Sequence, residues 1–160
     1  MSRCLLHTRC LINLPRNNWF VSQTTKEISG RALAPEFVDS AETDFPHVHF
    51  QVGDFCALPV EDGALGGILS WYSVIHTNPV EIPTVLDEFA RALRPGGSLL
   101  IGFFHGEKIQ LFDHAIAPAW FWPIEALAGL CENAQFEIME THTRADVGKR
   151  PHGAIIARRF

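Results

Sequence analysis

The sequence lacks the cysteine patterns that hold metal ions or disulfide frameworks. Its four cysteines form no Cys-x-x-Cys pair, and their spacing fits neither a zinc site nor a compact disulfide framework. They are Cys4, Cys10, Cys56 and Cys131. We therefore expect reduced thiols, no bound metal and a cytoplasmic location.

Positive charge is also scarce. The chain carries 13 lysines and arginines against 18 aspartates and glutamates, a net charge of −5, and the basic residues are scattered apart from Arg158 and Arg159. Nucleic acids and anionic membranes attract proteins through basic patches. The composition therefore predicts that neither is a partner.

Long apolar runs are missing as well. None approaches the roughly 20 residues that a bilayer-spanning helix requires. His7, Arg9 and Asn13 interrupt what would be the apolar part of a signal peptide. With 160 residues, 47% of them hydrophobic, the chain has material for one well-buried core. We expect a soluble protein with one domain, residues 1–160, whose first 27 or so residues are atypical.

What the chain does contain, from Val48 onward, is alternation of strand and helix patterns. Polar His47, His49 and Gln51 alternate with apolar neighbours, which is the period of a strand. Further strands are expected at 65–71 and 98–104, with an amphipathic helix at 81–94 between them. Strands that alternate with helices favour a parallel sheet, which binds ligands beyond the carboxyl ends of its strands.

The remaining elements are expected on either side of this region. A helix at 123–133 precedes strands at 136–143 and 154–158, which are suited to an antiparallel hairpin. Toward the N-terminus, strands are expected at 10–14 and 28–33 and helices at 19–27 and 35–41. The sequence thus predicts an open α/β sheet that ends in a hairpin.

Several motifs occur in a family-specific order. They are Gly53-Asp54-Phe55 followed by Leu58-Pro59 and Asp62, the strand end SWYSVIH at 70–76, EFARAL at 88–93, and RPGG at 94–97. Over residues 28–160 the chain resembles the class I, Rossmann-like methyltransferases that use S-adenosylmethionine, specifically the type 11 small-molecule group. The resemblance implies a mostly parallel sheet with a C-terminal antiparallel hairpin and helices on both faces.

The resemblance also implies S-adenosylmethionine as cofactor and a small molecule as substrate. Asp54 matches the acid that accepts from the adenine amino group, and Phe55 would offer its N–H and its ring to the base. Ser70, Trp71 and Tyr72 match the strand end that lines the methionine part. Taken alone, Asp54 also suits a turn, and the two aromatic residues also suit simple packing.

Methyl transfer depends chiefly on holding the nucleophile in line with the methyl group. Where a base is required, the candidates are His76, His105 and Tyr72, because each is expected at a strand end and histidine titrates near neutrality. His105, Asp113 and His114 follow a strand, and the aromatic run 120–122 would either line a substrate pocket or pack a loop onto the sheet.

His47 and His49 have a spacing that metal sites use, but no third ligand accompanies them. We interpret these two histidines as one face of a strand rather than as metal ligands.

The chain departs from the family at two places. The segment Asn13 to Asn18 has no glycine where a glycine-rich loop should approach the cofactor. Ala32 stands where an acid should bind the ribose, although Gly30, Pro35 and Glu36 keep the surrounding pattern. A degenerate relative, an altered upstream reading frame and an enzyme with an unusual loop all fit these departures.

Two functions therefore remain open. One is S-adenosylmethionine-dependent methyl transfer to a small molecule. The other is a catalytically weak or inactive binding module of the same fold, which lacks the glycine-rich loop.

Overall fold

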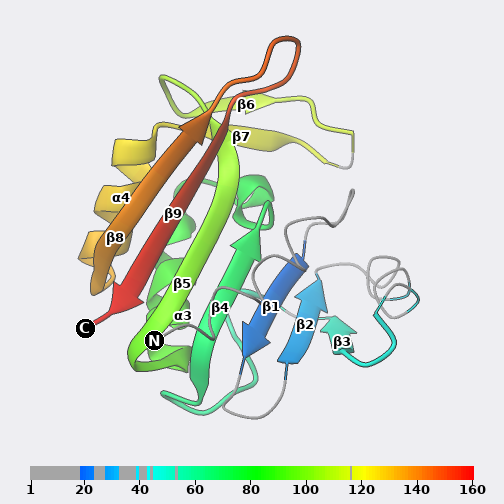
Figure 1. Ribbon diagram of the computed structural model, residues 1–160, viewed down its shortest axis with the longest axis vertical. Helices are drawn as coiled ribbons and strands as arrows, with labels where there is room; N and C mark the ends of the chain where they lie inside the picture. Colours follow the sequence, from blue (N-terminus) through cyan, green and yellow to red (C-terminus); the bar gives the residue numbers. More distant parts are fainter. Residues whose placement is uncertain are drawn as a thin grey trace.

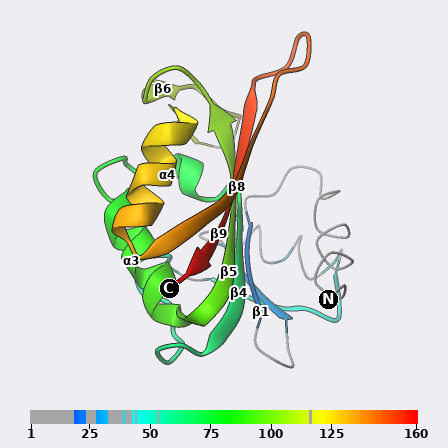
Figure 2. The same ribbon diagram turned by 60° about the vertical axis from the view of Figure 1, so that its left-hand side comes forward.

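A computed structural model describes residues 19–23, 28–32, 39, 43, 45–52, 54–115 and 117–160. Within these residues nine strands form one sheet, and two α-helices lie on one face of it (Figures 1 and 2). The helices are α3 (Ile82–Ala92) and α4 (Ile124–Asn133). A helix on the opposite face, which the family resemblance implies, is not among the elements described. Of the helix expected at 35–41, only Asp39 is described, and it is helical.

The strands follow the order β3-β2-β1-β4-β5-β7-β6, with β9 beside β5 and β8 beside β9. Their bounds are β1 Trp19–Gln23, β2 Ile28–Ala32, β3 His49–Val52, β4 Leu65–Trp71, β5 Leu93–His105, β6 Gln110–Phe112, β7 Ala119–Trp122, β8 Phe136–Arg144 and β9 His152–Arg159. Strands β2, β4 and the terminal hairpin of β8 and β9 are as predicted from the sequence. The short strands β6 and β7 were not anticipated.

Strand β1 runs against its neighbours. It pairs antiparallel with β2 on one side and with β4 on the other, whereas β2 is parallel to β3 and β4 is parallel to β5. Strands β2, β3, β4 and β5 therefore share one direction, and β1, which lies between β2 and β4, runs the opposite way. Trp19 pairs with Trp71 at the carboxyl end of β4, and Gln23 pairs with Gly67 near its amino end.

The expectation of a helix at 19–27 is wrong, because Trp19–Gln23 is this strand. A place between two strands gives its backbone N–H and C=O groups partners on both sides, and aromatic and β-branched residues such as Trp19, Phe20 and Val21 suit a strand. Tertiary pairing thus overrides the weak helix signal. The strand expected at 10–14 lies outside the described residues.

The β4-α3-β5 unit follows the prediction closely, with one difference. Helix α3 ends at Ala92, two residues early, and β5 already begins at Leu93. Leu93 is extended and fully buried, and it pairs with Leu65 across the sheet. Gly96 has a φ of 75°, a conformation that glycine adopts without strain. The Pro-Gly-Gly turn therefore forms an irregular start of the strand.

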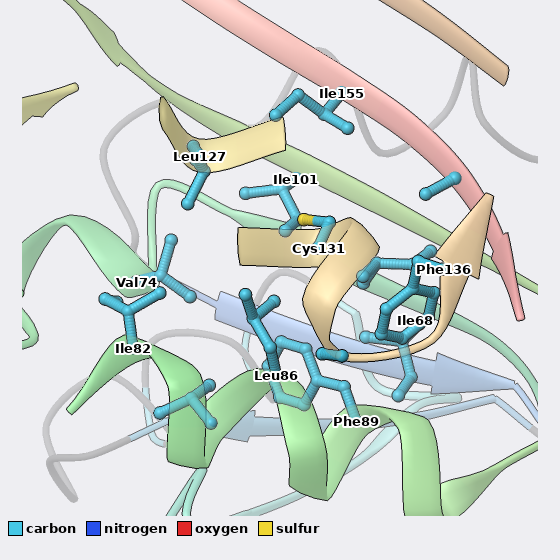
Figure 3. Packing of buried hydrophobic residues seen from close by; sticks show 14 of the residues in the cluster. Ile68, Val74, Ile82, Leu86, Phe89, Ile101, Leu127, Cys131, Phe136 and Ile155 are labelled. Atoms are coloured by element: carbon cyan, nitrogen blue, oxygen red, sulfur yellow. The ribbon is translucent and has the colours of Figure 1, made fainter. Parts of the chain in front are cut away.

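The core lies between the sheet and the two helices. Helix α3 contributes Ile82, Val85, Leu86 and Phe89, and α4 contributes Leu127 and Cys131. Figure 3 shows Ile82, Leu86 and Phe89 of α3 and Leu127 and Cys131 of α4 in one cluster with the sheet residues Ile68, Ile101, Phe136 and Ile155. The amphipathic pattern expected at 81–94 is thus seen in α3, whose apolar face is buried against the sheet. None of the helices in the described part of the chain is long and apolar enough to cross a membrane.

Arg91 of α3 forms hydrogen bonds with the loop that follows β3. Its guanidinium donates to Glu88 at 2.7 Å and to Asp62 at 2.6 Å. It also donates to the carbonyl oxygens of Val60 and Leu58 at 2.9 and 3.1 Å. Glu88 in turn accepts the Leu58 N–H at 2.6 Å. Because this loop begins at the candidate adenine residues, the network positions them against α3.

Replacing Glu88 by glutamine tests the network. The hydrogen bond from Arg91 holds the pKa of Glu88 below its ordinary value of 4.5, so its stabilising contribution is present above that value and is lost as the pH falls through the lowered pKa. We expect Glu88→Gln to lower the free energy of unfolding by about 2 kcal/mol at neutral pH. The difference should shrink below pH 4.5. Urea unfolding over this pH range measures it, with exposed Asp87→Asn as control; a pH-independent difference would contradict this role.

Candidate active site

The candidate residues gather at the carboxyl edge of the parallel strands. Asp54 follows β3, Trp71 ends β4 and His105 ends β5. Trp19, the first residue of reversed β1, lies at this same edge, because it pairs with Trp71. Gln23, the last residue of β1, lies toward the opposite edge, because it pairs with Gly67 near the start of β4.

Asp54 is exposed, and its Oδ1 accepts the N–H of Cys56 at 2.8 Å. The second carboxylate oxygen accepts no hydrogen bond from the described residues, so it is available to a ligand amino group. Phe55 differs from expectation in its surroundings, since its side chain is only 3% exposed within the core. The ring of Phe55 therefore packs in the core and offers no open face to a ligand.

Ser70 and Trp71 shape the end of β4. Ser70 is fully buried, and its hydroxyl shares a 2.7 Å hydrogen bond with the Ser73 hydroxyl. The Trp71 ring covers Gly102 of the neighbouring strand so closely that a Cβ there would collide with it. Both side chains therefore contact neighbouring parts of the protein at the end of β4.

Tyr72 adopts a strained conformation, with a φ of 54°. Its N–H donates to the Gly102 carbonyl at 2.9 Å, and its hydroxyl is hydrogen-bonded to Nδ1 of His152. Burial raises the pKa of Tyr72 to about 12 and lowers the pKa of His152. At neutral pH the pair is a protonated phenol beside a neutral imidazole. Strain of this kind recurs at functional sites, where the surrounding structure maintains it.

Aromatic rings join Tyr72 to His76. The Tyr72 ring lies 5.0 Å from that of Phe104, Phe104 lies 5.6 Å from His114, and His114 lies 5.4 Å from His76, all between centroids. His76 Nδ1 donates to the Pro118 carbonyl at 2.8 Å, because a carbonyl only accepts. In neutral His76 the other nitrogen, Nε2, is therefore an acceptor. The structure thus brings two of the three candidate bases into one cluster.

His105 lies apart from this cluster. Neighbouring strand residues point to opposite faces, and His105 lines a separate hollow of about 230 Å³ with Lys108, Gln110 and Phe121. The aromatic run 120–122 is likewise divided: Trp122 is fully buried in the core, whereas Phe121 is half-buried at this hollow. Trp122 therefore packs the core, whereas Phe121 borders a hollow.

Two residues of the site had not been anticipated. His152 and Arg150 line a hollow of about 700 Å³ together with Phe104, Gly148 and Lys149. The signal available in the sequence was their place at the start of the last strand, since β9 runs antiparallel to β5 and its first residue lies at the carboxyl end of β5. His47 and His49 are exposed, and the described residues contain no group of three or more possible metal ligands.

These features define a class of protein. The strand order, the carboxylate after β3 and the C-terminal hairpin are those of Rossmann-like methyltransferases, enzymes whose cofactor is S-adenosylmethionine. The chain belongs to the methyltransferase domain family, whose sequence model matches residues 18–97.

Solved structures share the fold at low sequence identity. A S-adenosylmethionine-dependent methyltransferase from Methanosarcina mazei is 18% identical, with a TM-score of 0.71 over 82% of this chain and 81% of that one. The 1,6-didemethyltoxoflavin-N1-methyltransferase of Burkholderia thailandensis is 20% identical, with a TM-score of 0.65 over 82% of this chain and 60% of that one. The [4+2]-cyclase SpnF is 16% identical, with a TM-score of 0.67 over 83% and 66%. No curated protein matches.

Asp54 fits the adenine end of the cofactor, because its carboxylate is exposed and could accept from an amino group. At the ribose end, Ala32 closes β2 at the same edge and has no hydrogen-bonding side chain. Asp54 is therefore the residue that would hold the cofactor, at its adenine end.

Proposed function

We propose that this chain transfers the methyl group of S-adenosylmethionine to a small molecule. The observation that carries the proposal is the Tyr72–His152 pair, held at the end of β4 beside a hollow and on the same sheet edge as Asp54. Bound S-adenosylmethionine would supply an electrophilic methyl group. A similar structure, the Burkholderia enzyme, was solved with 1,6-didemethyltoxoflavin and S-adenosylhomocysteine, which supports a small acceptor here.

Each group has a defined task in this proposal. Asp54 holds the adenine amino group, and Trp71 and Tyr72 form the wall between cofactor and acceptor. An acceptor O–H or N–H gives its proton to the Tyr72 oxygen, while the Tyr72 proton passes to Nδ1 of His152. The neutral imidazole, favoured by burial, is the form that accepts this proton. His76 is a second base, in the same aromatic cluster.

A product assay tests the proposal. The chain is incubated with isotope-labelled S-adenosylmethionine and a panel of small hydroxyl, amine and carboxylate compounds, and methylated products are detected by mass spectrometry. We expect labelled product from at least one acceptor. Asp54→Ala should lower the rate at subsaturating cofactor by at least about tenfold, because it removes a hydrogen bond to a charged group. Asp87→Ala, an exposed change on α3, is the matched control and should leave the rate unchanged.

A non-catalytic binding module is the second candidate. Reversed β1 and Ala32 favour it, because both remove contacts on the ribose side of the site. Label transfer to any acceptor in the panel, with loss in Asp54→Ala, would exclude it.

A further inference from the structure

The larger hollow of the site has a charge opposite to that of the chain. Among the residues that the structure describes, its lining contains the cations Lys149 and Arg150 and no carboxylate, although the chain as a whole carries a net charge of −5. The nearest acid of the loop, Asp146, is already paired with Arg144 at 2.9 Å. Arg150 also donates to the carbonyl oxygen of Asp113 at 3.5 Å, a neutral group, so the lining keeps an excess of positive charge that suits an anionic ligand.

The floor of the hollow is aromatic. The guanidinium carbon of Arg150 lies 4.9 Å from the centre of the Phe112 ring and 5.9 Å from that of Phe104. Phe104 itself faces the hollow. A cation over an aromatic ring is held in place by the ring's negative face. Arg150 is thus held at the rim, above Phe104, which is 9% exposed and offers only the edge of its apolar surface to the hollow.

The position of the cations is set by the loop between β8 and β9, which projects beyond β6 and β7 in Figure 1. Gly148 has a φ of 75°, and the Lys149 N–H donates to the Asp146 carbonyl at 3.1 Å. This turn directs the chain back to β9, whose first residue, His152, both lines the hollow and bonds to Tyr72. Lys149 and Arg150, which carry the positive charge, and His152, the proposed proton acceptor, therefore belong to one continuous segment of the chain.

We propose that this hollow is the subsite for the methyl acceptor and that the acceptor is a planar aromatic carboxylate. Its carboxylate lies between Lys149 and Arg150, its ring lies against Phe104, and its reacting group is directed toward Tyr72 and His152. A flat ring suits an apolar aromatic surface, and a guanidinium binds a carboxylate through two parallel hydrogen bonds. This assignment rests on the proposed function, because it names the substrate class of the same site.

Calorimetric titration of the full chain tests the subsite without turnover. The probes are 4-hydroxybenzoate and its uncharged counterpart 4-hydroxybenzyl alcohol, each with and without S-adenosylhomocysteine. We expect the carboxylate compound to bind at least about tenfold more tightly than the alcohol. Arg150→Gln should remove most of this preference. Arg158→Gln, an exposed arginine at the far end of the same strand, is the matched control and should change neither affinity.

Equal affinity for the two compounds, or an equal loss in Arg158→Gln, would overturn the subsite. Acetate that competes as well as 4-hydroxybenzoate would overturn the aromatic part of the assignment. Failure of the proposed function is a separate result: S-adenosylhomocysteine then does not bind, while 4-hydroxybenzoate still binds in a manner that depends on Arg150.

Discussion

Replacement of Phe89 by alanine should lower the free energy of unfolding by about 4 kcal/mol. Phe89 is fully buried on the inner face of α3, where Figure 3 shows its ring close to Leu86. Alanine removes most of this apolar surface and leaves a cavity between helix and sheet, which rigid surroundings fill only in part. Urea unfolding followed by circular dichroism measures the change.

Two further variants make this result interpretable. Thr84→Ala on the exposed side of α3 should change stability by less than about 0.5 kcal/mol. Phe89→Leu keeps more of the volume and should cost clearly less than alanine, which gives a measurable value even where Phe89→Ala does not fold. Equal effects of Phe89→Ala and Thr84→Ala would contradict the packing of α3 on the sheet.

Replacement of Tyr72 by phenylalanine should lower kcat by about 100-fold and leave KM nearly unchanged. Phenylalanine keeps the ring that packs on Trp71 and Phe104 and removes only the hydroxyl that joins the acceptor to His152. The measurement is steady-state kinetics with an acceptor found in the product assay.

The pH profile separates this role from a structural one. Burial lowers the pKa of His152, with Arg144 and Lys149 acting in the same direction and Asp146 against them. Wild-type activity should therefore fall as the pH drops through this lowered pKa, because protonated His152 no longer accepts a proton. Tyr72→Phe should lose that limb of the profile. A variant with unchanged kcat and an unchanged limb would remove Tyr72 and His152 from the proton path.

The fold was predictable from the sequence for those elements whose hydrophobic periodicity lies within a single helix or strand. Helix α3 and strands β4 and β5 each carry their own periodicity, and the motifs that mark the family meet in the contacts of Glu88 and Arg91 with the loop after β3. The direction of β1 was not predictable, because alternation and propensity are the same for a strand read in either direction. Only pairing with β2 and β4 decides it.

The candidate site was predictable only where its residues follow a recognisable strand. Tyr72 and His76 could be named as candidates because each follows such a strand. His152 was missed because it is 80 residues from Tyr72 in the chain and becomes its neighbour only through the pairing of β9 with β5. His105 was placed correctly at its strand end, but the alternation of side chains directs it to a different hollow from Phe104.

Binding of S-adenosylhomocysteine is the most direct test of the central claim, that this chain keeps a working cofactor site despite reversed β1 and Ala32. Calorimetry on the full chain at high protein concentration should show saturable binding to one site, weakened by at least about tenfold in Asp54→Ala, because the lost hydrogen bond is to a charged group. The absence of any heat of binding under these conditions would contradict the claim.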